Sequence, residues 1–447
     1  MRVAIIGGGI AGLTCAWYLQ AAGVAHDVFE ATDRPGGNLR TWAPPGGYLL
    51  ETGPNSLLMT PELAALLADL GLADAVEDVA AVGQHRYVLR HGRYQALPAS
   101  PPALLAHGFF SLKAKAQMVG ELLRRPAAPD PAETVASFFR RRFGQEVLDY
   151  AVAPFMAGIY AGDPAELLLH HTFPQLAALE QQHGSVLRGL MRTRGGTARR
   201  RTFNLRGGVQ TITDALAAQL AHYRPGAPVT ALRRQAAGIF WLEVAGAAAP
   251  LPYRHVVLAL PAYAAAPLLA PGFPAAAAAL AAVRYPPMSV VYSAYDRAAV
   301  AHPLAGFGAL HPKVEGTYAA GAVWTSSLYP SRVPAGQVLF TSFVGGTQHA
   351  AAAQAPEAEQ LAAVHAELAR LYGIAGPPRW QGRYFWPRSI PQFDRHIVAA
   401  RAAAEALESA QVLAVANWRA GVSVPDCVRR GRAVAEQLAT AAAGPAH

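Results

Sequence analysis

The first thirty residues alternate between short apolar runs and a glycine-rich turn. Residues 3–6 form a β-branched apolar run, which predicts a buried strand. Glycines follow at once, and apolar residues then recur at helical spacing until Gly23, which predicts a helix. Residues 27–30 read as a second strand that closes on an acidic side chain. The pattern therefore predicts strand, turn, helix and strand, which is the unit that opens a parallel α/β sheet.

The glycine turn of this unit has the spacing of a dinucleotide-binding motif, Gly7-x-Gly9-x-x-Gly12. The first glycine allows a tight turn, the second lets the backbone approach a pyrophosphate, and the third lets helix and strand pack closely. The N–H groups that begin the helix can bind the phosphates, and Glu30 can accept hydrogen bonds from ribose hydroxyls. The residues expected to bind the dinucleotide are Gly7, Gly8, Gly9, Ile10, Ala11, Gly12 and Glu30.

A second glycine pair, Gly36-Gly37, favours FAD over NAD. It lies where flavoproteins of the glutathione-reductase type pass the backbone beneath the flavin diphosphate, and another tight turn follows the apolar residues 48–50. The order of these motifs resembles the superfamily of flavin monooxygenases, amine oxidases and protoporphyrinogen oxidases, and the resemblance implies FAD as the cofactor. The further cofactor contacts expected in the two turns are Arg34, Gly36, Gly37, Asn38, Gly53, Pro54, Asn55 and Ser56.

The last forty residues continue the resemblance. Residues 413–418 read as an apolar strand that leads through Gly421 into a helical tail. In this superfamily the matching segment returns to the flavin, and a helix N-terminus there favours the reduced, anionic flavin. Residues 256–261 resemble one more strand of the same domain. The resemblance therefore adds four flavin contacts and one adenine contact, namely Trp418, Val422, Ser423 and Val424 for the flavin and Val229 for the adenine.

The middle of the chain resembles protoporphyrinogen oxidases in particular. Residues 85–98 are similar to the substrate-entry strand and hairpin of that family, and residues 150–163 are similar to one of its most distinctive segments. Matches at residues 304–310, 326–332 and 343–346 follow in the same order. The chain is thus identified as a member of that family by matches that run over nearly its whole length.

The resemblance implies an α/β fold with a discontinuous FAD domain of the glutathione-reductase (Rossmann) type. The fold would also contain a mixed α+β substrate domain and a mostly helical insertion. The insertion is expected to associate with membranes. The expected boundaries are 1–82, 204–263 and 384–447 for the FAD domain, 83–98 and 264–383 for the substrate domain, and 99–203 for the insertion.

The implied chemistry is the six-electron oxidation of protoporphyrinogen IX to protoporphyrin IX in haem biosynthesis. Each of three rounds moves a hydride from a bridge carbon to the flavin and a proton from a pyrrole nitrogen, and dioxygen reoxidises the flavin to give hydrogen peroxide. No acid or base is evident among the side chains. Asn55 is the one catalytic candidate, because it could orient the substrate beside the flavin.

Four residues match the substrate pocket of the family. Arg86 matches the arginine that pairs with a substrate propionate, a role that suits the planar guanidinium fork. Leu310, Val323 and Phe343 match positions that sandwich the macrocycle, although Val323 stands where leucine is usual. Alternatively, Arg86 is only an exposed arginine on a strand, and the other three are ordinary core residues.

Composition narrows the setting. The longest clean apolar run, residues 275–283, is far shorter than the roughly 20 residues that span a bilayer. Two cysteines, Cys15 and Cys427, cannot form a disulfide framework, and no room for a leader precedes the first strand, so we expect a cytoplasmic protein. The net charge of +9 favours anionic partners. Peripheral membrane contact is expected from apolar residues flanked by lysines, namely Leu104, Leu105, Phe109, Phe110, Leu112, Lys113 and Lys115.

Three other functions remain open. Coproporphyrinogen III oxidation uses the same fold on a substrate with four propionates instead of two. A flavin amine oxidase would need an aromatic cage and a lysine near the flavin, but the three lysines, Lys113, Lys115 and Lys313, lie outside the flavin motifs. A non-enzymatic flavin-bearing protein would need only those motifs. No nucleic-acid motif appears, and a homodimer is allowed by the resemblance.

Overall fold

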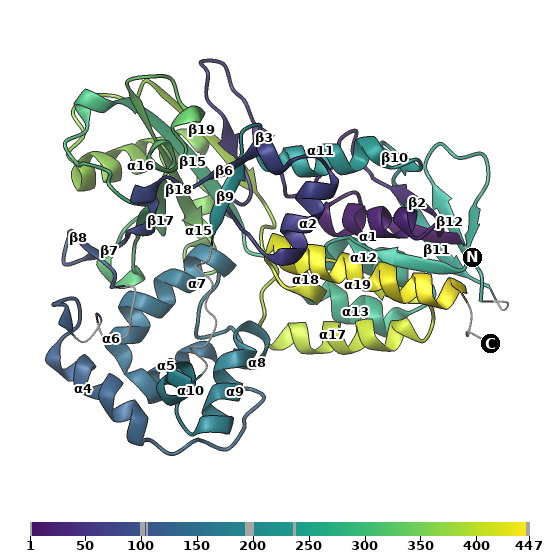
Figure 1. Ribbon diagram of the computed structural model, residues 1–447, viewed down its shortest axis with the longest axis horizontal. Helices are drawn as coiled ribbons and strands as arrows, with labels where there is room; N and C mark the ends of the chain where they lie inside the picture. The colour runs from purple at the N-terminus through teal and green to yellow at the C-terminus, as the bar shows by residue number, and fades with distance from the viewer. Residues whose placement is uncertain (1, 99–102, 104–105, 193–200, 236–237, 444–447) are drawn as a thin grey trace.

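The computed structural model describes residues 2–98, 103, 106–192, 201–235 and 238–443, and a parallel sheet lies at one end of it (Figure 1). The sheet has the order β10-β2-β1-β14-β20, and every pair in it is parallel. This strand order places the first strand of the chain in the centre and the last strand at one edge. Its strands are β1 (Arg2–Ile6), β2 (Ala25–Phe29), β10 (Tyr223–Arg224), β14 (His255–Leu258) and β20 (Val412–Ala414).

Both faces of the parallel sheet are covered. Val3, Ile5 and Val257 pack under α1 (Ile10–Ala21), α11 (Gln210–Gln219) and α19 (Val424–Ala443). Ala4 and Ile6, which point the other way, belong to a buried cluster with Leu232, Phe240 and Tyr253 of a three-stranded antiparallel sheet. The same cluster includes residues of α12 (Ala262–Leu269), α13 (Pro274–Ala281) and α17 (Arg395–Glu408). Apart from His26 and Asp27 of β2, the buried residues of these strands are apolar on both faces. This is the pattern of a doubly covered parallel sheet, so the predicted Rossmann-type domain is confirmed.

The first and last helices of the chain lie side by side, as the purple and yellow ribbons of Figure 1 show. A Cβ on Gly431 of α19 would lie only 2.7 Å from the carbonyl oxygen of Ala11 in α1. The absence of a side chain at residue 431 therefore permits the close approach of the two helices.

Smaller elements surround this domain. A three-stranded antiparallel sheet is built from β11 (Val229–Arg234), β12 (Phe240–Val244) and β13 (Leu251–Tyr253). A second one pairs β9 (Thr202–Leu205) with β5 (Leu57–Leu58) and β6 (Val76–Asp78), and β3 (Thr41–Trp42) pairs with β4 (Leu50–Glu51). Short helices complete the connections, namely α2 (Pro61–Asp69), α14 (Thr325–Leu328), α15 (Ala350–Gln354) and α18 (Asn417–Ala420).

A seven-stranded sheet of order β19-β15-β18-β17-β16-β7-β8 forms the second large body. Helix α16 (Glu357–Tyr372) packs on one of its faces through a buried cluster that includes Trp324, Phe340 and Tyr295. Its strands are β7 (Arg86–Arg90), β8 (Arg93–Ala96), β15 (Met288–Asp296), β16 (Gly308–Leu310), β17 (Gly321–Trp324), β18 (Gln337–Gly345) and β19 (Trp380–Trp386).

The third body is helical and lies below the seven-stranded sheet in Figure 1. Its elements, with a π-helical turn over Leu148–Val152, are α4 (Leu112–Gly120), η3 (Glu121–Leu123), α5 (Val135–Phe143), α6 (Gln145–Val147), α7 (Ala153–Tyr160), α8 (Leu169–Thr172), α9 (Pro174–His183) and α10 (Val186–Arg192).

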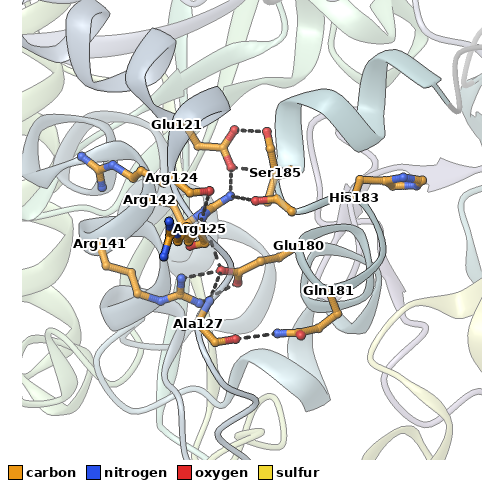
Figure 2. Close-up of polar contacts among 12 residues, drawn as sticks. Glu121, Arg124, Arg125, Ala127, Arg141, Arg142, Glu180, Gln181, His183 and Ser185 are labelled. Carbon is orange, nitrogen blue, oxygen red and sulfur yellow. Dashed lines mark hydrogen bonds and ion pairs between the residues drawn. The ribbon is translucent and has the colours of Figure 1, made fainter.

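Buried charges hold this helical body together, as Figure 2 shows. Arg142 is 1% exposed and forms an ion pair with Glu121, which is fully buried. The Glu121 carboxylate also accepts from the Ser185 hydroxyl at 2.5 Å and from the Val186 N–H at 2.9 Å, so it satisfies donors at the start of α10. Arg141 donates to the Glu180 carboxylate at 2.6 Å. Each buried charge thus has an opposite charge and further hydrogen bonds.

The predicted membrane-facing residues are corrected in part. Phe109 and Phe110 are buried, at 0% and 4% exposure, because they pack into the core beneath the guanidinium of Arg90, whose carbon lies 5.4 Å from the Phe109 ring. Leu112 is 84% exposed, as expected of a membrane-facing side chain. The predicted residues 104 and 105 lie outside the described ranges. Within those ranges, no helix combines the length and apolarity needed to cross a membrane.

Candidate active site

The glycine turn after β1 leaves an open space at the start of α1. Gly7 has a φ of +114°, and a Cβ on Gly12 would lie 2.1 Å from the Gly7 carbonyl oxygen, so both positions require glycine. By contrast, no described atom lies within 4 Å of where a Cβ on Gly9 would be. Gly9 is the N-cap of α1, and no described side chain caps that helix. The free N–H groups and the open space fit a pyrophosphate.

Glu30 stands at the end of β2 beside this turn. Its carboxylate accepts from the Gly8 N–H at 2.7 Å and from the N–H and hydroxyl of Thr32 at 2.9 and 2.8 Å. The Glu30 carbonyl accepts from the Ala227 N–H at 2.8 Å, which brings the start of β11 and Val229 to the same edge. Glu30 and Val229 therefore lie on the side of the turn where a ribose and an adenine are expected.

The second glycine pair lies directly against the first. The Gly36 N–H donates to the Gly8 carbonyl at 2.8 Å, and Gly36 forms a parallel bridge with Gly9. A Cβ on Gly37 would be 3.5 Å from the Cα of Gly9. Arg34 folds over its own loop and donates to the Pro35 carbonyl at 3.2 Å. The two glycine motifs predicted to hold one cofactor are thus brought together, and Asn38 is exposed beside them.

The turn over residues 52–56 is anchored by a buried ion pair that the sequence did not reveal. Glu51 and Arg332, 281 positions apart, meet at 2.9 Å and are both nearly inaccessible. The Gly53 position needs glycine, because a Cβ there would lie 2.1 Å from the Asn38 carbonyl oxygen. Glu51 also accepts hydrogen bonds from three surrounding groups, the hydroxyl of Thr41, the amide of Asn204 and the N–H of Val209.

Asn55 and Ser56 are held by neighbours on opposite sides of this turn. The Asn55 backbone carbonyl accepts from the Asn204 side-chain amide at 2.9 Å. The Asn55 side-chain amide donates only to the Gly53 carbonyl of the same turn, at 3.5 Å. The Ser56 hydroxyl shares a hydrogen bond with the Tyr329 hydroxyl at 2.9 Å. The Asn55 side chain therefore makes only one long contact among the described residues, and its orientation toward a substrate stays a prediction.

The C-terminal segment forms a capped helix start. Trp418 is buried, and its indole N–H donates to the Leu260 carbonyl at 3.1 Å. Ser423 caps α19, because its hydroxyl accepts from the Asp426 N–H at 3.2 Å and donates to the Asp426 carboxylate at 2.5 Å. Val422 and Ser423 therefore lie in the tight segment between α18 and α19, and Val424 opens α19.

The four predicted substrate residues share one face of the seven-stranded sheet. Arg86 pairs with Gly308, which pairs with Val323, and Leu310 pairs with Gly321, which pairs with Phe343. Paired residues, and residues two apart on one strand, point to the same side of a sheet. This face is opposite to the face that α16 covers, and we call it the open face.

The open face leads toward the flavin motifs. Leu310, Val323 and Phe343 are only half-buried although their strands lie inside the sheet. Further along, the indole N–H of Trp386 donates to the Thr52 carbonyl at 2.7 Å, and the hydroxyl of Tyr292 donates to the Glu51 carbonyl at 2.8 Å. An apolar, partly open surface thus extends to the turn that is predicted to contact the flavin.

Arg86 is exposed at one end of this face. Its guanidinium carbon lies 4.9 Å from the Phe307 ring, and partial desolvation lowers the pKa of the guanidinium. Among the described residues, no carboxylate forms an ion pair with it. Arg86 is therefore an uncompensated cation at the edge of an apolar slot, as binding of a carboxylate would require.

Sequence reasoning missed Tyr384 and its partner Arg40. The Arg40 guanidinium donates to the Tyr384 hydroxyl at 3.1 Å and lies 5.3 Å from its ring. Tyr384 pairs with Val290 and so extends the open face next to Phe343. Arg40 stands within the second glycine motif and could have been noticed there, whereas nothing in the local sequence marks Tyr384.

Comparison with known proteins agrees with this geometry. The sequence model of the flavin-containing amine oxidoreductases matches residues 10–439. Two solved structures share the fold over 98% of this chain and 98% of their own: a protein from Exiguobacterium sp. 255-15, with a TM-score of 0.81 and 21% identity, and cyclohexylamine oxidase from Brevibacterium oxydans IH-35A, with 0.72 and 19%. The chain belongs to the family of flavin-containing amine oxidoreductases, and it is an FAD-dependent oxidoreductase.

Three curated relatives of this chain are porphyrinogen oxidases. Protoporphyrinogen oxidase 2 of Arabidopsis thaliana is 30% identical over 96% of this chain and 92% of its own length. Protoporphyrinogen oxidase of Bos taurus is 30% identical, and coproporphyrinogen III oxidase of Bacillus subtilis 28%, each over 98% of both chains. The resemblance to protoporphyrinogen oxidases is confirmed over nearly the full length.

Proposed function

We propose that this protein oxidises protoporphyrinogen IX to protoporphyrin IX in haem biosynthesis, with dioxygen as the electron acceptor. The observation that supports it is the open face, where an unpaired guanidinium adjoins an apolar slot that leads to the flavin motifs. The overall reaction removes six hydrogen atoms from the macrocycle, and three molecules of dioxygen become three of hydrogen peroxide. Coproporphyrinogen III is the alternative substrate.

The chain's own residues bind and orient the macrocycle. Arg86 would pair with a propionate, and Leu310, Val323 and Phe343 would contact the flat ring and exclude water from it. Bound FAD supplies the two-electron oxidation itself. Asn55 would orient the substrate beside the cofactor. The residues that would hold FAD are those of the two glycine motifs, with Glu30, Val229 and the segment from Trp418 to Val424.

A flavin amine oxidase is the less suitable function for this face. A protonated amine would meet the uncompensated positive charge of Arg86, and like charges in a partly desolvated slot repel. Of the three lysines, Lys313 is the one that follows a strand of the open face, β16. It lies outside the flavin motifs. The charge of the slot therefore favours a carboxylate substrate.

The helical body is also proposed to dock on an anionic membrane from the cytoplasmic side. Leu112 and Leu123 are 84% and 86% exposed, and Lys113 and Lys115 stand beside Leu112 on α4. Figure 1 shows α4 at the outer edge of the helical body, away from the parallel sheet. Exposed leucines flanked by lysines are typical of surfaces that lie on a bilayer without spanning it.

The test of the proposed function is steady-state kinetics of the purified, FAD-loaded protein on protoporphyrinogen IX and coproporphyrinogen III in parallel, with peroxide measured alongside porphyrin. We expect turnover of protoporphyrinogen IX with three peroxides for each porphyrin. Turnover of neither porphyrinogen by a protein that carries stoichiometric FAD would contradict the proposal. An absorbance spectrum before the assay separates this outcome from a simple lack of cofactor.

A further inference from the structure

A small cavity lies between α7 and the ends of strands β16 to β18. His311, Lys313, Gln348 and His349 supply its polar groups, and Ala157 and Gly345 are among its apolar walls. The His311 ring is already engaged, by the Tyr94 hydroxyl at 2.9 Å and the Ala319 carbonyl at 3.1 Å. It offers about 10 Å³ to the centres of water-sized groups, which is roughly the space for one water molecule or one carboxylate oxygen. The cavity therefore suits a small polar head rather than a ring.

The cavity adjoins the open face at the end opposite Arg86. Arg86 on β7 lies in one row across the sheet with Gly308, Val323 and, on β18, Thr341. The cavity is lined by Gly345, four residues further along β18 than Thr341. At about 3.3 Å per residue the two rows are about 13 Å apart, a spacing on the scale of a tetrapyrrole. Leu310 lies between them and touches α7, because a Cβ on Gly158 would be 3.4 Å from its Cδ2. One flat ligand over Leu310 would thus have Arg86 at one end and the cavity at the other.

Lys313, which lines this cavity, forms no ion pair with Glu315 or Glu367, and both carboxylates have other partners. Glu315 accepts from the N–H groups of His91 and Gly92, at 2.9 and 3.1 Å. Glu367 accepts from two backbone N–H groups, at 2.6 and 3.1 Å, and lies 3.6 Å from the His311 imidazole. Within the described ranges, Lys313 forms no ion pair. The ammonium of Lys313 is therefore available to an incoming anion.

His349 stands close enough to sense that cation. Burial lowers the pKa of its imidazole and the positive charge of Lys313 lowers it further, which together outweigh the opposite effect of the Glu367 carboxylate. At neutral pH the ring is therefore uncharged and can donate one N–H, and no described residue forms a side-chain hydrogen bond with it. Lys313 thus offers charge and His349 offers a directed donor to the same small space.

We propose that Lys313 and His349 form a second carboxylate subsite, which binds a propionate at the end of the slot opposite Arg86. The inference rests on the proposed function, since it assigns the subsite to a porphyrinogen. In protoporphyrinogen IX both propionates leave from one edge of the ring and vinyl groups occupy the other, whereas coproporphyrinogen III carries propionates on both edges. The subsite is therefore used by the tetracarboxylate and makes coproporphyrinogen III a substrate of this protein.

The test compares three variants on both porphyrinogens. Lys313→Ala should lower kcat/KM for coproporphyrinogen III about tenfold and leave protoporphyrinogen IX nearly unchanged, because a charge-assisted hydrogen bond is lost for one substrate only. Lys313→Arg should restore most of the loss. Arg370→Ala, which removes an exposed cation from α16 on the opposite face of the sheet, is the matched control and should change neither value.

Equal losses on both substrates, no loss on either, or a wild type that accepts only protoporphyrinogen IX would overturn the subsite. A wild type that oxidises neither substrate would overturn the proposed function instead. In that case, binding of coproporphyrin III and of its tetramethyl ester, measured by fluorescence titration, still decides the inference. Lys313→Ala must weaken binding of the acid and leave binding of the ester unchanged.

Discussion

The glycine turns of the cofactor domain and the core of the helical body are fixed by different means. In the glycine turns, missing side chains matter most: Gly12 and Gly53 stand where a Cβ would meet a carbonyl oxygen at 2.1 Å. In the helical body the long charged side chains of Arg142 and Glu121 fill the core and pair there. Backbone contacts leave a recognisable spacing in the sequence, whereas a buried pair 21 positions apart leaves none. Tight backbone contacts can therefore be read from a sequence, whereas pairs of distant side chains cannot.

The largest expected effect tests the backbone side of this comparison. In Gly9→Val the new side chain enters the open space at the start of α1, so the protein should fold but lose its FAD completely. The flavin-to-protein ratio from absorbance, with a thermal melt of the same sample, checks this. Stoichiometric flavin in a folded Gly9→Val variant would show that the pyrophosphate lies elsewhere.

Gly12→Ala is the matched variant. It also adds a side chain to this turn, but the protein has no space for a Cβ at Gly12. Its Cβ would lie 2.1 Å from the Gly7 carbonyl oxygen, so the protein itself should be destabilised or fail to fold. The two glycines should therefore separate loss of cofactor from loss of fold. A Gly12→Ala variant as stable as wild type would contradict the close contact.

The second expected effect tests the charged side of the comparison. Arg142→Met leaves Glu121 charged and buried without its partner, which should lower the free energy of unfolding by about 3–5 kcal/mol. Chemical denaturation monitored by circular dichroism measures the change. Arg201→Met is the control, since Arg201 pairs with Asp78 at the surface and should cost less than about 1 kcal/mol. Similar losses in both variants would remove the distinction between buried and exposed pairs.

The third effect concerns the open face, where a charged side chain, Arg86, lies at the edge of an apolar surface. Arg86→Ala should raise KM for a porphyrinogen about ten- to a hundredfold and change kcat less, because a charge-assisted pair contributes roughly 1.5–3 kcal/mol. Arg86→Lys should recover part of the loss, since an ammonium cannot reproduce the bidentate fork. Steady-state kinetics with the free acid and with a propionate ester form the measurement. If the Arg86→Ala protein has the KM of wild type, Arg86 is an ordinary solvated side chain that does not bind the substrate.

The smallest expected effect concerns the surface of the helical body. Replacing Leu112 and Leu123 by serine should weaken binding to anionic vesicles about three- to tenfold, because each exposed leucine buries only part of its area in a bilayer. Flotation at low salt measures the bound fraction. Val398→Ser on α17, which removes a 45% exposed apolar side chain from the cofactor domain, should have no effect. If wild type already floats free of the vesicles, the docking proposal is wrong.

Sequence reasoning worked best where the constraint is local. The spacing of Gly7, Gly9 and Gly12 predicted the turn correctly, because a tight backbone leaves few residue types that fit. The common face of Arg86 and Phe343 could not be read in the same way, since it depends on strand pairing across more than 200 residues. Their roles came from resemblance alone.

The failures have equally plain causes. Phe109 and Phe110 stand near two lysines and so suggested a membrane-facing segment, but the tertiary core that receives them is formed by residues from other segments. The Glu51–Arg332 pair was missed because its partners are far apart in sequence and each is ordinary in its own surroundings. Local patterns indicate where a backbone must bend, but not which distant side chain will meet it.

The contact between α1 and α19 has a consequence for how the protein is made. The first strand and helix leave the ribosome early, yet the helix that covers them is synthesised more than 400 residues later. Until then the apolar surface of α1 around Ala11 lacks its cover, and loops of this length close slowly. The cofactor domain therefore cannot be completed before α19 has been synthesised, and α1 waits for its cover until then.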